Sequence, residues 1–363
     1  MATTLEDRIE TPLAGPAVDP GTPAGLPKRG VQMKAIVNTR YGPPDVLQLA
    51  EVERPAPKEH EVLIKVEAAS ANPLDIARVR GTPFLLRVFL RIFLPRFSDG
   101  VLRPKSRLGA DVAGRVEAVG AGVTQFQPGD EVFGDIGAGA FAEYACAPET
   151  RLALKPAHIS FEAAAAAPVT GFTALQGLRD KGHIQAGQNV LINGASGGVG
   201  TMAVQMAKSF GAEVTAVCST RNLDLVRSIG ADHVVDYTQQ DFAKTGQRYD
   251  LIFDAAANHS ASAYERALSG GGTCVVAGFS NLAQMPPMLL LGPRVSKASG
   301  KKIGFMGIAK PNPDDLMVIQ EMLETGKVLP VIDRTYPLSQ VPEAIRYLEG
   351  KHARGKIVIS IGR

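Results

Sequence analysis

The chain has 363 residues, 45% of them hydrophobic, and a formal net charge of +3, which fits a soluble protein of about two domains. So small a net charge provides no broad basic footprint for phosphate groups, and we expect no nucleic-acid partner. The three cysteines, Cys146, Cys218 and Cys274, have no CxxC spacing. This excludes a disulfide framework and a four-cysteine zinc lobe, and it favours a reducing compartment.

The first 32 residues show no apolar period. Residues 1–31 include five prolines and four glycines, so we expect 1–32 to be a disordered tail. Glu6, Asp7 and Glu10 argue against a secretory signal. The longest apolar run, residues 84–94, contains two arginines and is too short for a bilayer, so we expect no integral membrane span. Together with the reducing compartment, these features predict a cytoplasmic protein.

Residues 33–158 contain short β-rich runs that are separated by glycine and proline. The clearest runs are Lys34–Val37, Glu61–Glu67, Val112–Val119 and Glu131–Gly134. Their spacing predicts a partly open β-barrel rather than strands alternating with helices.

Strands alternate with helices from residue 159 to residue 306. An alanine-rich helix, Glu162–Ala167, comes first, and a later helix has apolar residues at helical spacing from Val199 to Phe210 and stops at Gly211. The six predicted strands are Gln188–Asn193, Val214–Cys218, His233–Asp236, Asp250–Ala255, Thr273–Ala277 and Ile303–Met306. This order predicts an α/β fold with a doubly wound parallel Rossmann sheet. Residues 307–363 have no further repeat and are expected to return to the first domain.

A glycine-rich segment, Asn193-Gly-Ala-Ser-Gly-Gly-Val-Gly200, joins the first of these strands to its helix. Glycines at this turn let the backbone approach a pyrophosphate, and free amides at the helix N-terminus attract it. The residues expected to contact a dinucleotide are Ala195, which stands where the fingerprint has its first glycine, Ser196, Gly197, Gly198, Val199 and Gly200. The alternative is a plain glycine-rich turn. The correct strand and helix on either side favour dinucleotide binding.

The end of the second strand predicts which cofactor binds. Proteins specific for NAD usually place an acid there, whereas this chain has Ser219, Thr220 and Arg221. Hydroxyl groups and a guanidinium suit a 2′-phosphate, so the expected cofactor is NADPH. Tyr237, after the third strand, would add a hydroxyl or a wall at the adenosine end. The alternatives are a solvated Arg221 and a packing role for Tyr237.

Six further segments accompany the glycine motif in a characteristic order. They are Ala69-Ser-Ala-Asn-Pro-Leu-Asp75, Leu108-Gly-Ala-Asp-Val-Ala-Gly114, Gln127-Pro-Gly-Asp-Glu-Val-Phe133, Val169-Thr-Gly-Phe-Thr-Ala174, Gly230-Ala-Asp-His-Val-Val-Asp-Tyr237 and Ala353-Arg-Gly-Lys-Ile-Val358. With them, residues 33–363 resemble the medium-chain dehydrogenase/reductase superfamily, in its zinc-independent, quinone-oxidoreductase-like branch related to zeta-crystallin. The resemblance implies a GroES-like catalytic domain over 33–158 with 307–363, a Rossmann domain over 159–306, and a homodimer.

The same resemblance bears on metal binding. Zinc alcohol dehydrogenases of the superfamily have a cysteine where this chain has Asn72, and Gly-His-Glu where it has Gly109-Ala110-Asp111. Without the thiolate and the imidazole no tetrahedral zinc site remains, so we expect a metal-free protein.

Residue roles implied by the resemblance centre on the nicotinamide. Asn72 would lie near it and donate from its amide to a developing enolate oxygen. The residues expected to line or approach the cofactor are Thr170, Gly278, Phe279, Ser280 and Lys356. Structural alternatives are a helix-capping Thr170 and a solvated Lys356.

The expected reaction is hydride transfer from NADPH to a quinone or an α,β-unsaturated carbonyl compound, because such acceptors need no Lewis acid. The alternatives are a zinc-free alcohol dehydrogenase or enoyl reductase on a larger substrate, and an NADPH-binding sensor or structural protein with little turnover.

A basic segment, residues 80–107, holds seven Lys or Arg and one Asp. Within it, Phe84, Leu85, Phe89 and Phe93 are predicted to belong to an apolar lid over a small hydrophobic substrate. The alternative is that residues 84–97 make a peripheral contact with an anionic membrane.

Overall fold

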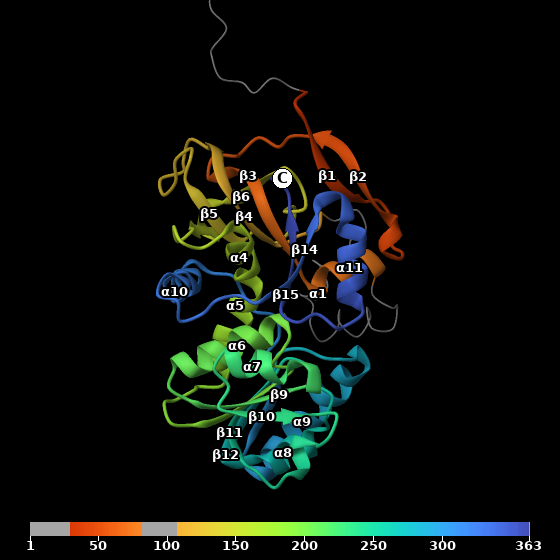
Figure 1. Cartoon of the computed structure of the whole chain (residues 1–363), viewed down its shortest axis with the longest axis vertical. Helices are drawn as coiled ribbons and strands as arrows, with labels where there is room; N and C mark the ends of the chain where they lie inside the picture. Colours follow the sequence, from red (N-terminus) through yellow and green to blue (C-terminus); the bar gives the residue numbers. More distant parts are fainter. Residues whose placement is uncertain (1–29, 82–106, 363) are drawn as a thin grey trace, which may run out of the picture.

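The computed structural model describes residues 30–81 and 107–362, which form two large sheets stacked along the long axis of the molecule and one small two-stranded sheet (Figure 1). The first sheet has seven strands in the order β14-β15-β3-β4-β5-β7, with β6 also paired to β3. They are β3 (Glu61–Ala71), β4 (Asp111–Val119), β5 (Glu131–Asp135), β6 (Tyr144–Pro148), β7 (Leu152–Leu154), β14 (Ile332–Pro337) and β15 (Lys356–Ser360). Beside them β1 (Gln32–Asn38) pairs antiparallel with β2 (Leu47–Glu53).

The second sheet has six strands, all parallel, in the order β10-β9-β8-β11-β12-β13. They are β8 (Asn189–Asn193), β9 (Glu213–Cys218), β10 (His233–Asp236), β11 (Tyr249–Asp254), β12 (Leu268–Val276) and β13 (Lys302–Phe305). Val190, Leu191 and Ile192 are successive and fully buried. Helices therefore cover both faces of this sheet, as parallel sheets require.

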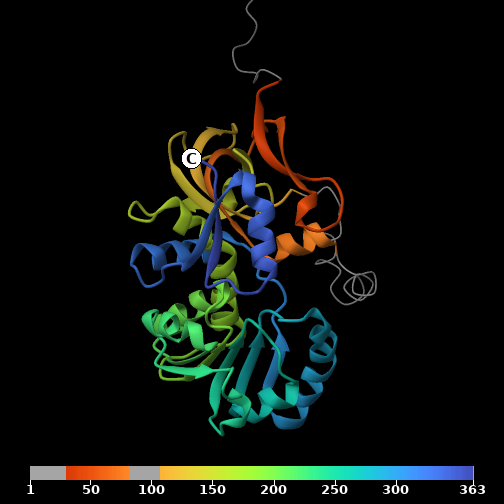
Figure 2. The same cartoon turned by 45° about the vertical axis from the view of Figure 1, so that its right-hand side comes forward.

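Nine α-helices surround the two sheets in the described part of the chain. They are α1 (Pro73–Arg80), α4 (Phe161–Ala166), α5 (Pro168–Leu175), α6 (Gly198–Ser209), α7 (Leu223–Ser228), α8 (Ala261–Ala267), α9 (Met285–Ser299), α10 (Pro313–Glu324) and α11 (Val341–Glu349). Helices α4 and α5 lie between the sheets (Figures 1 and 2). Ala164, Ala165 and Ala166 of α4 are fully buried and share one core with Ala113 of β4 and Ile192 of β8. Small side chains thus let this helix pack closely against the first sheet.

The predicted α/β class and the doubly wound parallel sheet are confirmed, and each of the six strands predicted after residue 159 is present. The structure moves some boundaries: β12 begins five residues before its predicted start, at Leu268. Strands β2, β6, β7 and β14 lie outside the predicted strands. The C-terminal strand β15 pairs antiparallel with β3, so the chain returns to the first sheet.

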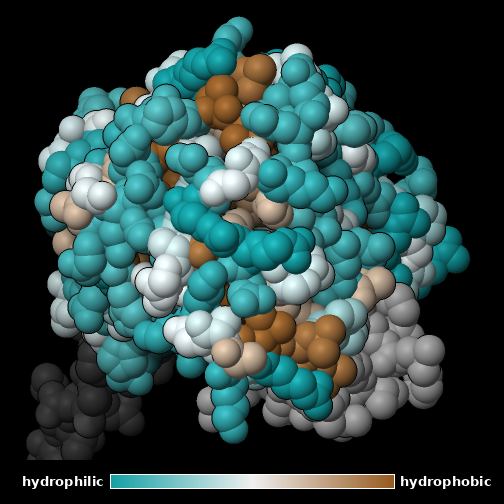
Figure 3. All heavy atoms as spheres, turned by 90° about the horizontal axis from the view of Figure 1, so that it is seen from below, coloured by the Kyte–Doolittle hydropathy of each residue, from teal (hydrophilic) through white to brown (hydrophobic). Residues whose placement is uncertain are grey.

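Seen from below, the surface is mostly hydrophilic, with separate apolar patches (Figure 3). Leu290 and Leu291 of α9 are each about half exposed. Among the described residues, no helix combines the length and apolar character needed to cross a bilayer.

Candidate active site

Three neighbouring strands bring the central polar residues of the site together. The register of β15 with β3 places Ile357 opposite Ala71, and that of β3 with β4 places Ser70 opposite Asp111. Lys356, at the start of β15, therefore lies beside Asn72, which follows the last residue of β3. All of these pairings join residues that are far apart in the chain.

Asn72 begins helix α1, and Asp75 fixes its position. The Asp75 carboxylate accepts hydrogen bonds from the Asn72 N–H at 2.9 Å and from the Gly109 N–H at 3.0 Å. Burial raises the pKa of this fully buried carboxyl group, and the two backbone donors oppose that rise. Asp75 thereby ties the start of α1 to the segment that leads into β4.

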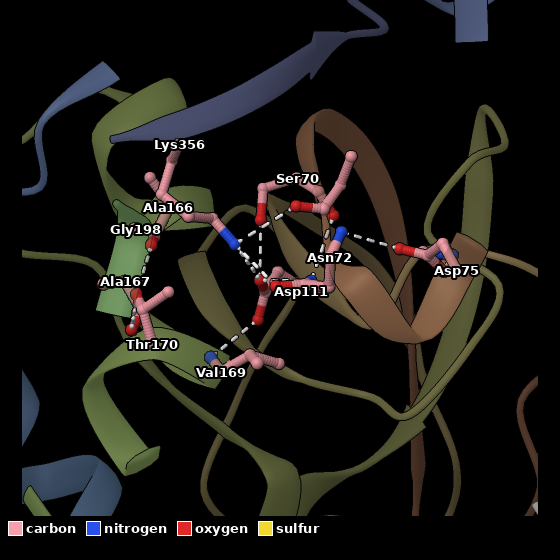
Figure 4. Close-up of polar contacts among 12 residues, drawn as sticks. Ser70, Asn72, Asp75, Asp111, Ala166, Ala167, Val169, Thr170, Gly198 and Lys356 are labelled. Atoms are coloured by element: carbon pink, nitrogen blue, oxygen red, sulfur yellow. Dashed lines mark hydrogen bonds and ion pairs between the residues drawn. The ribbon is translucent and has the colours of Figure 1, made fainter. Parts of the chain in front are cut away.

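A buried cluster of Lys356, Asn72, Asp111 and Ser70 lies at this point (Figure 4). The Lys356 ammonium donates to Asn72 Oδ1 at 2.7 Å and to Asp111 Oδ2 at 3.1 Å. The same Asp111 oxygen accepts from Ser70 Oγ at 2.6 Å and from Asn72 Nδ2 at 2.9 Å. Because Lys356 and Asp111 are 4% and 0% exposed, their ion pair is shielded from solvent, and removing one partner would leave a buried charge.

The other Asp111 oxygen connects the cluster to the second domain. Asp111 Oδ1 accepts from the Val169 N–H of α5 at 2.9 Å. The next residue, Thr170, lies inside α5 and donates its hydroxyl back to the carbonyl oxygens of Ala166 and Ala167. The Thr170 methyl group and Lys356 both lie beside Gly198. The cluster is therefore next to the first turn of α6.

A second carboxyl group lies opposite Asp111. Asp135, at the end of β5, is its register partner on the neighbouring strand. Burial, and next the charge of Asp111, raise the pKa of Asp135 to about 6. Its carboxylate accepts a hydrogen bond from the Gly137 N–H at 2.8 Å.

The glycine motif has the backbone geometry of a dinucleotide site. A Cβ atom on Gly200 would overlap the Gly194 carbonyl oxygen, so only glycine allows this approach of helix to strand. A Cβ atom on Gly198 would come within 2.9 Å of Lys356 Cδ and 3.3 Å of Thr170 Cγ2, and would fill the space between them. The first N–H groups of α6, starting at Gly198, have no partner within the helix. These features fit a pyrophosphate next to the buried cluster.

The residues predicted to bind a 2′-phosphate lie at the carboxyl end of β9. Ser219 Oγ accepts from Asn222 Nδ2 at 3.2 Å, and Asn222 also donates to Ser196 Oγ at 2.9 Å. Thr220 donates its hydroxyl to Asp236 at 2.5 Å and is thus already engaged. Arg221 is exposed and donates to the His352 carbonyl oxygen at 3.0 Å.

The remaining predicted cofactor residues lie on neighbouring strand ends. Tyr237 follows β10 and is 60% exposed. Gly278 accepts a hydrogen bond from the Ala257 N–H, and Ser280 donates its hydroxyl to the Ala256 carbonyl oxygen. The Phe279 ring packs against Phe305, with ring centroids 5.3 Å apart. Tyr237 and these three residues thus lie at the edge of the sheet that carries the glycine motif.

Sequence reasoning missed three residues of the site. Asp111 was noted only as a position that lacks a zinc ligand, and Ser70 and Asn222 were not singled out. No local signal marks them, because each acts through a partner from another segment. Phe84, Leu85, Phe89, Phe93 and the membrane alternative for 84–97 lie outside the described residues. Within the described ranges, no group of His, Cys, Asp and Glu side chains has the arrangement of a metal site.

Comparisons with known proteins cover both domains. Residues 58–157 match the family model of the alcohol dehydrogenase GroES-like domain, and residues 229–359 match that of the zinc-binding dehydrogenases. The chain is 35% identical over 373 residues to a 2-methylene-furan-3-one reductase of Solanum lycopersicum, covering 99% of this chain and 86% of the relative. It is 35% identical over 360 residues to the chloroplastic NADPH-dependent alkenal/one oxidoreductase of Arabidopsis thaliana, covering 95% and 83%. The solved quinone oxidoreductase of Coxiella burnetii is 30% identical, with a TM-score of 0.77 and coverage of 91% and 99%.

Proposed function

The chain belongs to the zinc-independent, quinone-oxidoreductase-like branch of the medium-chain dehydrogenase/reductase superfamily, and we propose that its buried Lys356–Asn72–Asp111 cluster is the catalytic centre of an NADPH-dependent reductase. Its substrates are quinones or α,β-unsaturated carbonyl compounds, as in the names of the relatives. The observation that carries the proposal is the ammonium group of Lys356, which is held by an amide and a carboxylate beside the glycine motif.

Bound NADPH supplies a hydride. When a conjugated acceptor takes up a hydride, negative charge develops on its carbonyl oxygen, and a cation in a dry site stabilises that charge strongly. Lys356 Nζ carries that charge. It donates to Asn72 Oδ1, to Asp111 Oδ2 and, at 3.5 Å, to the Ala71 carbonyl oxygen, and the oxygen of the acceptor would replace the longest of these contacts. Asn72 was expected to donate to the oxygen itself, but its Nδ2 donates to Asp111 at 2.9 Å and its Oδ1 accepts from Lys356 at 2.7 Å. We therefore assign Asn72 a positioning role and Lys356 the donor role.

The residues proposed to hold the cofactor belong to the glycine motif and to the ends of neighbouring strands. The amides of Gly198, Val199 and Gly200 would bind the pyrophosphate. Ala195, Ser196 and Gly197 would shape the turn before them, where the Ala195 and Gly197 N–H groups donate to the carbonyl oxygens of Val217 and Gly194. Ser219 and Arg221 would bind the 2′-phosphate, while Thr220 keeps its hydroxyl on Asp236. Tyr237 is proposed to lie at the adenosine end of the cofactor. The residues proposed to lie around the nicotinamide are Thr170, Gly278, Phe279 and Ser280.

The donor set around Asn72 suits a metal-free reaction. Asn72 and Ala110 stand at the positions of the zinc ligands in the alcohol dehydrogenases of the superfamily. Proteins bind zinc through Cys, His, Asp and Glu side chains, so neither an amide nor a methyl group replaces those ligands. Asp111, at the third position, is occupied by the ammonium of Lys356 at 3.1 Å. In this proposal the lysine ammonium supplies the positive charge that zinc provides in those enzymes.

The test is the variant Lys356→Met, assayed for NADPH oxidation with an enone and with a quinone. Loss of one donor to a developing oxyanion typically lowers kcat by roughly 10²–10³-fold. The matched control is Lys155→Met, because Lys155 is another buried lysine of the same domain, paired with Glu131 at 2.9 Å. Asp111→Asn should also lower kcat, since it releases Lys356. Fluorescence titration would measure the Kd for NADPH separately.

We expect a large loss of kcat in Lys356→Met, a small change in NADPH affinity, and a kcat near the wild-type value in Lys155→Met. A Lys356→Met enzyme that is folded and as active as the Lys155→Met control would refute the proposed role of Lys356.

A small hydrophobic substrate, a homodimer and a cytoplasmic location remain predictions. A panel of enones and quinones of increasing size tests the first, sedimentation tests the second, and cell fractionation tests the third.

A further inference from the structure

One segment of the catalytic domain, residues 351–355, runs along the carboxyl edge of the parallel sheet. The chain leads through it from α11 to β15 at the boundary between the two sheets (Figures 1 and 2). Lys351 Nζ donates to the carbonyl oxygen of Ser280, after β12. The His352 carbonyl accepts from Arg221, after β9, and Gly355 forms a bridge with Gly197, after β8. The segment therefore contacts three strand ends where a Rossmann sheet binds its dinucleotide.

Two arginines meet where this segment passes the end of β9. Arg354 donates from its guanidinium to the Arg221 carbonyl oxygen at 3.3 Å, while Arg221 donates to the His352 carbonyl oxygen at 3.0 Å. Each arginine thus reaches the main chain of the other's domain. Both side chains belong to exposed residues.

Neither guanidinium forms an ion pair with a carboxylate within the described parts of the chain, whose ion pairs involve other arginines. Asp333 accepts from the main-chain N–H of Arg354, and Asp236 accepts from Thr220 and Thr238. The guanidinium groups of Arg221 and Arg354 repel each other, because both are positively charged and only backbone carbonyl oxygens hold them. An anion with several oxygens would relieve that repulsion.

We propose that Arg354 is a second determinant of cofactor choice, and that Arg221 and Arg354 bind the adenosine 2′-phosphate from the two domains together. This inference rests on the NADPH dependence in the proposed function. Guanidinium groups suit the task because their planar donors match phosphate oxygens in pairs. NADPH would then link the catalytic domain to the Rossmann domain at this point, whereas NADH would not.

The experiment compares Arg354→Ala, Arg221→Ala and the double variant with the wild-type protein. Kd values are measured by titration calorimetry for NADPH and NADH, and for the fragments 2′,5′-ADP and 5′-AMP. Loss of a charge-assisted contact weakens binding by roughly 10–150-fold. We expect Arg354→Ala to show this loss for NADPH and 2′,5′-ADP, and to leave NADH and 5′-AMP within about twofold of the wild type. Arg354→Lys should recover part of the affinity.

Arg346→Ala is the control, because Arg346 is an exposed arginine of the preceding helix whose guanidinium pairs with Asp45 at 2.7 Å. It should change none of the four Kd values. Equal losses for NADPH and NADH in Arg354→Ala would mean that Arg354 only supports the segment, and would overturn the inference. Unchanged NADPH affinity would overturn it as well. A wild-type protein without preference for NADPH contradicts the proposed cofactor itself, which is a distinguishable result.

Discussion

Asp135 and Asp111 face each other in a way that makes folding stability depend on pH. Ile136 N–H donates to the Ala110 carbonyl at 2.8 Å, so the neighbouring pair Asp111–Asp135 occupies a non-hydrogen-bonded position of the antiparallel ladder. Side chains are closest at such positions, and like charges directly opposite each other are destabilising. Asp111 is neutralised by Lys356, whereas the Asp135 carboxylate has one backbone donor, Gly137. Asp135 is buried with little compensation, and its pKa is raised.

The magnitude follows from the pKa of Asp135, which burial and Asp111 raise from 3.8 to about 6. A difference of about two units corresponds to about 3 kcal/mol. Because the folded-state pKa is the higher one, the folded protein binds more protons than the unfolded chain between pH 3.8 and about 6. The free energy of unfolding therefore falls as the pH rises through this window, and the full penalty is present above it.

The variant Asp135→Asn removes this titration and keeps an oxygen that can accept from Gly137. From about pH 4 to pH 8, we expect the unfolding free energy of the variant to rise by about 2.5 kcal/mol relative to that of the wild type, because part of the penalty is already present at pH 4. Urea unfolding at both pH values measures this difference. Asp45→Asn is the control, because the side chain of Asp45 is 70% exposed. If wild type and Asp135→Asn show the same change in unfolding free energy between the two pH values, the raised pKa assigned to Asp135 is wrong.

The other predictions concern the glycine motif and metal dependence. Gly200→Ala should lower the stability by roughly 1–3 kcal/mol or more and weaken NADPH binding, because the new methyl would overlap the Gly194 carbonyl oxygen. Thermal unfolding and cofactor titration measure the two effects. The control is Gly270→Ala, because Gly270 has no neighbour near its Cβ position and no positive φ. An unchanged Tm of Gly200→Ala would contradict the close approach. Prolonged dialysis against a chelator should leave the activity intact, because Asn72 and Ala110 replace the zinc ligands. Stoichiometric zinc in an elemental analysis, together with loss of activity on dialysis, would overturn this expectation.

The sequence by itself determined the parallel sheet, the glycine motif and the order of the domains along the chain. These features depend on local patterns. Buried strands appear as continuous apolar runs, α6 shows helical spacing, and Gly200 must be glycine because its Cβ position overlaps the nearby Gly194 carbonyl oxygen. Family-like motifs then placed Asn72 and Lys356 near the cofactor, without relating the two to each other.

Only the tertiary structure decided which residues meet. Lys356 contacts Asn72 and Asp111, which lie 284 and 245 residues away in the chain. Their meeting depends on the register of β15 with β3 and of β3 with β4, and a shift by one residue would turn each side chain to the opposite face. The same holds for Arg221 and Arg354, 133 residues apart, which come together because the C-terminal segment returns past the end of β9. Local sequence patterns carry no record of such pairings, since they arise when distant strands share hydrogen bonds and bury a common core.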